Sequence, residues 1–563
     1  MNDGYKMKKN NFLIVLTDQQ RFDTIAAAGH PYMQTPNLDR LVNEGCLFKN
    51  AYSPNPICIP ARHCLITGMT PRFHGYYGNF DQPIADSGIP TLARVMSENG
   101  WHTAALGKSH FVPPTEHHGY DELMLMEELP EDVEDDEYLK FLRKQGYENL
   151  RNIHGVRTMI YHEPQISLVP DECHGTTWLG NYASDWIKRN QHRPWLLTLG
   201  WIKPHPPWNI PESQIDRYKD ADLPEPFTDA ICPPFPQDAL NNGLEDSDEE
   251  KRKIREAYFT SVSMVDDAFG VVMKTLEETD LLDDTFIIFT SDHGEMLQDR
   301  GMYQKSVPYE SSARVPFVIR YPKRFKPGST DERFIDLMDI FPTILDEAGI
   351  DYYYKKSHEN YSLVGGSLLP ETSNPGTRSR EIQCSECLHE RYRWVMSRDK
   401  RYKFIHYYRG GHEYLYDLEN DPGEANNLIG TDKCPQKILN KLRNAAIDYE
   451  KNLGEPGRIE NDNFKKCVVN EPGEEQDMYP VFDWNNGNKY PKWCFSAFQN
   501  FGRESKETEA DIILDELEKS VSHRGGRKML KAVKCQPGSK EMMCRAFSEI
   551  EEKRKAMENL IMS

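Results

Sequence analysis

The chain has 563 residues, and its 68 Lys and Arg against 89 Asp and Glu give a formal net charge of −21 at pH 7. Hydrophobic residues make up 38% of it and aromatic residues 11%, which excludes disorder over most of the length. The acidic balance argues against a nucleic acid or an anionic membrane as a partner, because both attract basic surfaces. A small anionic substrate stays possible, since a site can be locally positive inside an acidic protein.

The lengths of the apolar runs and the spacing of the cysteines indicate the cellular location of the protein. The longest runs, 12–16 and 286–289, fall far below the roughly 20 residues of a membrane span. The first residues lack the apolar stretch of a signal peptide, and the 12 cysteines are not densely paired. These features predict a cytoplasmic protein with no membrane partner. Secretion or a periplasmic location is the alternative if a signal has been removed.

Buried strands alternate with helices through the first two-thirds of the chain. Continuous apolar runs, typical of parallel strands, and helical periodicity appear in turn. The helix that begins near Thr35 carries Pro36 at its first position and Thr35 as its expected cap, and Gly45 ends it. The pattern predicts an α/β fold with a doubly wound, mostly parallel sheet flanked by helices, and active groups at the carboxyl ends of its strands. The expected strands are 12–16, 103–106, 196–199, 285–290 and 316–319, and the other expected helices are 91–99 and 254–276.

The pattern changes after about residue 370. Residues 391–408 read as an antiparallel hairpin, which predicts a smaller C-terminal α+β subdomain containing an antiparallel sheet. Beyond residue 460 the chain is rich in Asn, Lys and Glu, with amphipathic helices expected over 510–519 and 540–560. The predicted division is a catalytic domain over 1–375, a subdomain over 376–460 and a partly helical extension over 461–563. The extension is also a candidate contact for a homo-oligomer.

Two predicted strands end in polar residues of the kind that bind cations. Asp18 and Gln19 follow the first strand, and Asp292 and His293 follow the strand over 285–290. Carboxylate and amide oxygens are hard ligands. Either group alone often does no more than end a strand, but two acidic strand ends in one parallel sheet can converge on one metal.

The segment between these strand ends contains Cys58, which is followed two residues later by a proline that can start a helix. The positive end of that helix and Arg62, one turn further on, favour an anionic nucleophile or a bound anion at Cys58. An isolated cysteine is more often a buried structural residue. The complete pattern Cys-x-Pro-x-Arg, closed by Thr67 and Gly68, favours the chemical interpretation.

With this pattern the chain resembles the formylglycine-dependent (type I) sulfatases of the alkaline phosphatase superfamily. Their Cys-x-Pro-x-Arg signal directs oxidation of its Cys to formylglycine, and residues 58–62 match it. The resemblance extends over most of 11–430 and implies an alkaline-phosphatase-like fold. Its other segments, in the family's order, are 35–41, 107–110, 203–207, 291–294, 366–370 and 415–422.

The resemblance implies one divalent cation in the site. Calcium is the first expectation, with manganese and magnesium left open. Many relatives have a second Asp at the position of Gln19 and an Asn at that of His293, and an imidazole is a softer ligand than an amide oxygen. The implied metal-site residues are Asp18, Gln19, Asp292, His293 and the formylglycine made from Cys58.

The resemblance also implies catalytic and substrate-binding roles. Formylglycine would hydrate to a diol that attacks sulfur, and fixed cations would stabilise charge on the bridging oxygen. His205 would protonate the leaving alcohol. His110 would accept a proton when sulfate leaves, and Arg62 would hold the diol. The implied catalytic residues are Cys58, Arg62, Lys108, His110, His205 and Lys305, and the implied substrate-binding residues are Asn79, Lys108, His205 and Lys305.

Each of these residues has a plainer interpretation. Lys108 alone would be a solvated strand end, His205 a rigid loop residue between prolines, and Asn79 part of a Gly-Asn turn. The pair Cys384 and Cys387 indicates a strand or turn rather than zinc, because no second pair stands at finger spacing.

The function expected from the resemblance is hydrolysis of a sulfate monoester, either a sulfated carbohydrate or an aryl sulfate. A formylglycine-generating or sulfatase-maturing enzyme is then an implied partner. The alternative within the superfamily is a phosphonate monoester or phosphodiester hydrolase. Lys108 with His110 favours the sulfatase, whose pattern has both. A catalytically dead scaffold is the non-enzyme alternative, and the intact set of groups argues against it.

Overall fold

The computed structural model describes the chain from residue 9 to residue 520, with gaps. The expected helix over 540–560 and the expected boundary between 375 and 376 lie outside the described residues. Within the described residues, no helix is both long and apolar enough to cross a membrane. The described ranges are 9–79, 89–130, 134–157, 162–227, 247–351, 363–370, 380–387, 393–465, 511–512, 515–516 and 518–520.

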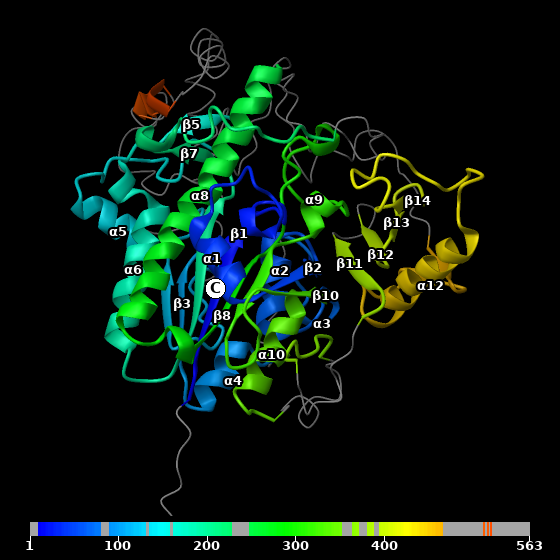
Figure 1. Ribbon diagram of the computed structural model, residues 1–563, viewed down its shortest axis with the longest axis horizontal. Helices are drawn as coiled ribbons and strands as arrows, with labels where there is room; N and C mark the ends of the chain where they lie inside the picture. The colour runs from blue at the N-terminus through cyan, green and yellow to red at the C-terminus, as the bar shows by residue number, and fades with distance from the viewer. Residues whose placement is uncertain are drawn as a thin grey trace, which may run out of the picture.

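An eight-stranded sheet forms the centre of the molecule (Figure 1). All neighbouring strands are parallel except β9, which runs antiparallel to β2 and β8. The predicted fold class is confirmed. The strands, in spatial order, are β10 (Ser329–Asp336), β2 (Cys46–Tyr52), β9 (Phe317–Arg320), β8 (Thr285–Ser291), β1 (Asn11–Asp18), β6 (Trp195–Pro204), β3 (His102–Gly107) and β4 (Glu122–Leu125).

Helices cover both faces of this sheet, as its apolar strands require. Successive residues of a strand point to opposite faces, and in β1 Leu13 and Val15 join one core while Ile14 and Leu16 join the other. Full burial of each such side chain contributes about 1.5–3 kcal/mol. The first core is closed by α1 (Pro36–Glu44), α5 (Glu137–Lys144), α6 (Gly175–Asn190) and α8 (Asp248–Glu278), and the second by α2 (Cys58–Thr67), α4 (Leu92–Glu98) and α10 (Ile340–Glu347).

The prediction that the Thr35 side chain caps the start of α1 was wrong. The Thr35 hydroxyl oxygen instead accepts a hydrogen bond from Ala26 N at 3.0 Å. The first turn of α1 is capped from another helix, because Asp266 of α8 accepts from Leu38 N at 2.7 Å and from Asn37 N at 3.2 Å. A carboxylate from a helix far along the chain thus satisfies the free amide groups of α1.

Helix α8 begins six residues before the expected start at residue 254. Its first turn has no apolar periodicity, so the pattern that predicted the helix could not include it. A capping box between Ser247 and Glu250 holds this turn, and three acidic residues there favour the positive end of the helix.

A separate four-stranded antiparallel sheet follows the core, with α12 (Gln436–Asn452) packed on it. It contains the predicted hairpin, as β12 (Trp394–Arg398) and β13 (Tyr402–Tyr407), between β11 (Gln383–Cys387) and β14 (His412–Asp417). Cys384 and Cys387 lie on β11, which agrees with the strand interpretation of this pair. Shorter elements among the described residues include α3 (Pro71–His74), α9 (Glu310–Ala313), β5 (Pro164–Ile166) paired with β7 (Trp208–Ile210), and β15 (Ile459–Glu460) paired with β16 (Asn463–Phe464).

Candidate active site

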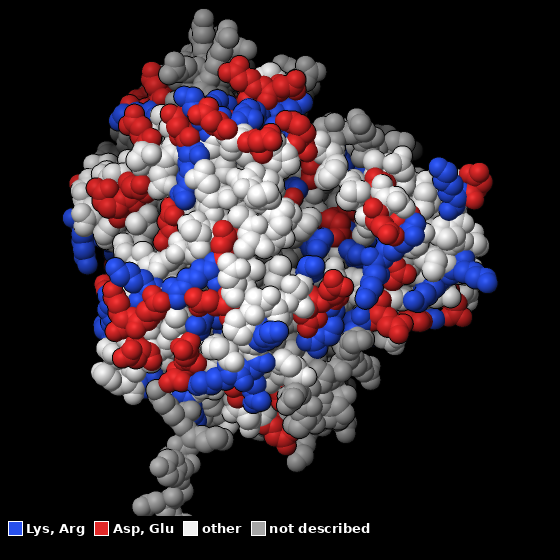
Figure 2. All heavy atoms as spheres, viewed as in Figure 1, with Lys and Arg blue, Asp and Glu red and all other residues white. Residues whose placement is uncertain are grey.

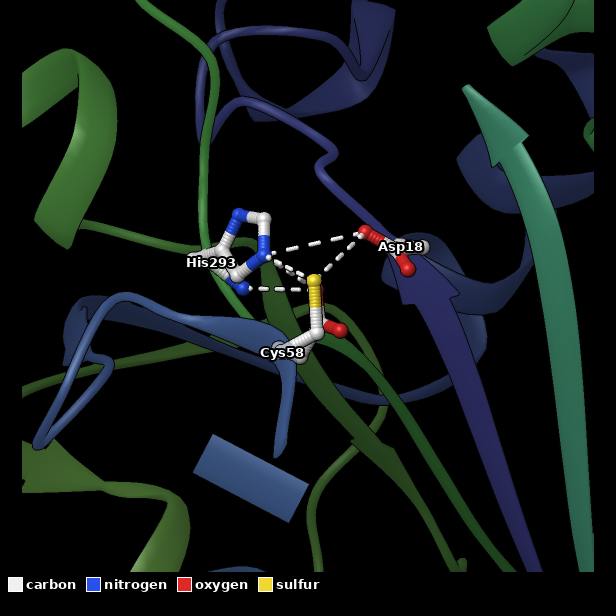
Figure 3. Close-up of side chains that lie close together, drawn as sticks. Asp18, Cys58 and His293 are labelled. Atoms are coloured by element: carbon white, nitrogen blue, oxygen red, sulfur yellow. Dashed lines mark hydrogen bonds and ion pairs between the residues drawn. The ribbon is translucent and has the colours of Figure 1, made fainter. Parts of the chain in front are cut away.

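Four buried side chains converge at the carboxyl ends of the central strands. Figure 3 labels three of them, Asp18, Cys58 and His293. Asp18 ends β1, Asp292 and His293 follow the neighbouring parallel strand β8, and Cys58 begins α2. One ligand atom from each lies within 4.8 Å of the others, and all four residues are fully buried. The order of β1 and β8 in the sheet brings the two acidic strand ends together.

The His293 ring presents one nitrogen to this cluster. Its Nε2 lies 3.1 Å from Cys58 Sγ and 3.7 Å from Asp18 Oδ1. Its Nδ1 lies 3.0 Å from Gly294 O, which assigns the proton to Nδ1 and a lone pair to Nε2. Burial lowers the pKa of His293 and so favours this neutral form. Gly294 fixes the segment tightly, since a Cβ there would lie 2.0 Å from Ser311 O.

Two cations contact the acidic groups. Arg62, one turn into α2, donates from Nε to Asp292 Oδ2 at 3.0 Å and from Nη1 to Lys108 O at 2.7 Å. Lys108 follows β3 and contacts both Asp18 and Glu128. Burial by itself would raise the pKa of Asp18, but the positive charges of Lys108 and Arg62 outweigh it and hold that pKa well below its usual range. Asp18 is therefore an ionised carboxylate.

Lys305, His205 and Gln19 form a second group beside the first. The Lys305 ammonium donates to Gln19 Oε1 at 2.6 Å and lies 3.1 Å from His205 Nε2. His205 Nδ1 is 2.6 Å from Pro206 O, so Nε2 is the nitrogen that accepts from Lys305. Burial lowers the pKa of His205 well below its usual value. Both ends of the Gln19 amide have protein partners, Lys305 at the oxygen and Glu295 at the nitrogen. The role of Gln19 as a metal ligand therefore stays a prediction.

Asn79 and His110 lie at the edge of the site. Asn79 Oδ1 accepts from Ile59 N at 3.0 Å, which ties it to the first turn of α2 beside Cys58. His110 is held by its backbone, whose N–H donates to Glu127 Oε1 at 2.8 Å. Within the described residues its Nδ1 has no hydrogen-bond partner. Their expected roles toward substrate stay predictions.

Glu127, Glu128 and Arg157 were missed from the sequence. Glu128 Oε2 lies 2.5 Å from Lys108 Nζ, and its other oxygen pairs with Arg157 and lies 3.4 Å from His205 Nδ1. Glu127 and Glu128 follow closely after β4, so the rule that selected Asp18 and Asp292 at strand ends could have found them. Nothing local marks Arg157.

The charges of the site are buried rather than displayed at the surface. Arg62, Lys108 and His205 are each 2% exposed. Acidic and basic side chains intermingle over the face shown in Figure 2. The net charge of −21 therefore does not describe the environment of a bound substrate.

The donor set fits a divalent cation. Two carboxylates and an imidazole with an inward lone pair converge, and oxygen with nitrogen donors suits calcium, manganese or magnesium. Two carboxylates buried together need positive charge, and Arg62 and Lys108 pair with them, although Lys108 is shared with Glu128. The residues present are thus consistent with a metal site.

Two models of known protein families match the chain. The sulfatase family model matches residues 10–350, and a model described as N-sulphoglucosamine sulphohydrolase, C-terminal, matches 298–452. The chain belongs to the sulfatase family of hydrolases, within the alkaline phosphatase superfamily. The expected family and enzyme class are confirmed.

Relatives cover most of the chain. The arylsulfatase of Clostridium perfringens (strain 13 / Type A) is 30% identical over 457 residues, which are 76% of this chain and 92% of that protein. The phosphonate monoester hydrolase of Agrobacterium radiobacter has a TM-score of 0.65 at 25% identity, covering 77% of this chain and 94% of the other. A structure solved in complex with its substrate D-glucosamine-2-N,6-O-disulfate has a TM-score of 0.64 at 22% identity, covering 80% of this chain and 100% of the other, and supports the fold alone.

Proposed function

We propose that this protein hydrolyses sulfate monoesters with a formylglycine made from Cys58 and one divalent cation. The observation that carries the proposal is the convergence of the Cys58 side chain with Asp18, Asp292 and His293 at the start of α2. A structural cysteine would not need two carboxylates and an imidazole nitrogen around it.

Asp18, Asp292 and His293 would hold the cation, with Gln19 as a further oxygen donor once Lys305 turns toward substrate. The cation supplies Lewis acidity, which lowers the pKa of a bound hydroxyl and polarises a sulfate oxygen. Calcium is our first choice because carboxylates dominate the set, and the imidazole keeps manganese and magnesium in the comparison.

A formylglycine made from Cys58 would take up one water to give a diol. One hydroxyl of the diol would attack sulfur as the bond from sulfur to the leaving oxygen breaks, and deprotonation of the other would expel sulfate and restore the aldehyde. Arg62, held on Asp292, orients the nucleophile from the same helix turn. Asn79 supports that turn through Ile59 N. His110, at the edge of the site, accepts the proton released with sulfate.

Lys305 and His205 serve the leaving group. In the structure the Lys305 ammonium donates toward His205 Nε2, so the charged pair holds one proton that it can give up. We assign to this pair the proton that neutralises the leaving alkoxide, and to Lys108 the stabilisation of charge on sulfate. Lys108 is fully buried and its position is set by Asp18 and Glu128.

A maturing enzyme would have to read Cys-x-Pro-x-Arg before the chain folds around it. All residues from Cys58 to Arg62 are buried in α2. We therefore infer that a formylglycine-generating or sulfatase-maturing enzyme acts on the unfolded segment. Tryptic cleavage after Lys49 and Arg62 releases this segment as one peptide, and mass spectrometry of it from the native host tests the modification. An unmodified thiol there would refute the mechanism.

The reaction is tested by comparing kcat/KM for an aryl sulfate and for an aryl phosphonate monoester on the same preparation. We expect the sulfate to be preferred. A strong phosphonate preference would instead favour a phosphonate monoester or phosphodiester hydrolase. The similarity to the phosphonate monoester hydrolase structure is the reason for including this substrate. A panel of defined sulfated saccharides then separates a carbohydrate substrate from an aryl sulfate. The structure solved with a sulfated glucosamine supports including saccharides in that panel.

A further inference from the structure

The C-terminal extension returns to the catalytic domain through one buried carboxylate, Glu516. It belongs to the short helical fragment at 515–516 and 518–520, drawn as a separate orange-red piece in Figure 1. Glu516 is only 3% exposed. Its Oε1 accepts from Arg151 N at 2.7 Å, and its Oε2 accepts from Asn152 N at 3.0 Å and from Asn152 Nδ2 at 2.6 Å. Three donors therefore depend on a residue more than 350 positions away.

The segment held by Glu516 runs directly to the loop that carries His205. Gly155 N donates to Asn152 O at 3.0 Å, which closes a turn next to the contact with Glu516. A Cβ on Gly155 would lie 2.8 Å from Pro207 Cβ, so the segment packs without spare room against the residues after His205. Val156 is held on its other side, where both its N–H and its C=O bond to the Gln165 amide at 2.8 Å.

Arg157 ends this segment and reaches the active site. It pairs with Glu128, whose carboxylate is 2.5 Å from Lys108 Nζ and 3.4 Å from His205 Nδ1. The position of Arg157 thus determines where Glu128 stands between two groups that the proposed mechanism uses. All of these side chains are buried, so small displacements change their electrostatic interactions strongly.

We propose that Glu516 is a positioning residue for the active site: it holds residues 151–157 so that Arg157 keeps Glu128 against Lys108 and His205. The kinetic part of this inference rests on the proposed function. The physical reason is hydrogen-bond satisfaction. Without the carboxylate, the N–H groups of Arg151 and Asn152 would lose this buried acceptor, which favours opening of the segment.

The test uses full-length protein with Glu516→Ala and Glu516→Gln. Asp515→Asn is the matched control, because Asp515 lies next in sequence, is exposed and pairs only with Lys519 among the described residues. We expect kcat/KM for an aryl sulfate to fall about tenfold in Glu516→Ala, the lower end for a supporting residue of a site. In Glu516→Gln the loss of kcat/KM should be smaller, because the amide keeps one carbonyl acceptor. In Asp515→Asn kcat/KM should stay within about twofold of wild type.

Two further measurements separate positioning from a merely structural role. Hydrogen exchange should become faster over 151–157 and over 203–209 in Glu516→Ala. In a double-mutant cycle with Arg157→Ala, adding Glu516→Ala should cost almost nothing more, because both changes act through the same path. If the double variant instead lost activity by the product of the two single losses, the proposed path through Arg157 would be overturned.

Activity of Glu516→Ala equal to wild type, per folded molecule, would overturn the positioning role even if the variant were less stable. If wild type itself hydrolyses neither sulfate nor phosphonate esters, the proposed function fails instead. The role of Glu516 in positioning the segment is then tested by hydrogen exchange alone. Unchanged hydrogen exchange over 203–209 in Glu516→Ala would overturn that role.

Discussion

The Cys58 thiol lies 3.1 Å from Nε2 of His293, although 235 positions separate the two residues. The contact exists because α2 begins where β1 and β8 end, so the first residue of a helix faces two strand ends. It places the proposed nucleophile at the nitrogen that His293 leaves unprotonated.

Replacing Cys58 with Ala should abolish turnover and leave the fold intact. The change removes the precursor of the nucleophile, and loss of a nucleophile costs on the order of 10⁴-fold or more. Burial of Ala at this position removes only one sulfur atom, so the circular dichroism spectrum should be unchanged. Activity is measured on an aryl sulfate, and retained activity would rule out nucleophilic catalysis by this residue.

Chelation should remove activity, and a divalent cation should restore it. We expect calcium to restore the most, with manganese and magnesium compared at equal concentration after dialysis against a chelator. His293→Ala should raise the cation concentration needed for half-recovery by about 10–100-fold, since a buried donor is lost. His192→Ala, at an exposed histidine, is the control. Full activity in the thoroughly chelated enzyme would argue against a metal requirement.

Glu128→Gln should lower activity although no sequence pattern selected Glu128. The amide keeps the shape but removes the charge that Lys108 and Arg157 share. We expect kcat/KM to fall about 10–100-fold and the unfolding free energy to fall by about 3 kcal/mol, because Arg157 loses its buried partner. Glu134→Gln, at an exposed residue, should match wild type in both measurements. An active, equally stable Glu128→Gln would show that this carboxylate is dispensable.

Lys403→Met should destabilise the junction between the C-terminal sheet and the core. Lys403, on β13, donates to Glu424 Oε1 at 2.8 Å and lies 2.7 Å from Glu310 Oε1 of α9. Removing the ammonium leaves two buried carboxylates without it, which costs about 3–5 kcal/mol. Denaturant unfolding measures the loss, and Lys400→Met, at an exposed position on the same hairpin, should cost less than about 0.5 kcal/mol. Equal stability of the two variants would contradict the prediction.

Lys203 should make stability rise with pH above neutrality. Burial lowers the pKa of its ammonium from the ordinary value of 10.5 to about 7. Between these values the unfolded chain binds the proton and the folded one does not, so the unfolding free energy increases with pH across that window. Below about pH 7 both states are protonated and the full burial penalty is present.

The measurement for Lys203 is the difference in unfolding free energy between wild type and Lys203→Gln at pH 7, 8 and 9. We expect this difference to shift in favour of wild type as the pH rises, because the glutamine carries no titrating group. Other lysines are common to both proteins and cancel. A difference that is constant with pH would show that Lys203 titrates at its ordinary value.

Much of the core could be predicted because its signals are local. The apolar runs of β1 and β8 indicate strands buried on both faces, and a parallel sheet brings their carboxyl ends together. These two facts are enough to predict that Asp18, Asp292 and His293 lie close together, and Cys-x-Pro-x-Arg locates Cys58. The start of α8 was misplaced because its first turn is held by a capping box instead of apolar contacts.

The sequence by itself therefore determined the fold class, the sulfatase family and the residues at the strand ends, since periodicity and contiguous motifs carry that information. Only the tertiary structure decided that Asp266 caps α1, that Glu128 stands between Lys108 and His205, and that Glu516 holds residues 151–157. Such contacts join residues far apart along the chain. They depend on how helices and loops pack, and no local propensity or spacing encodes that geometry.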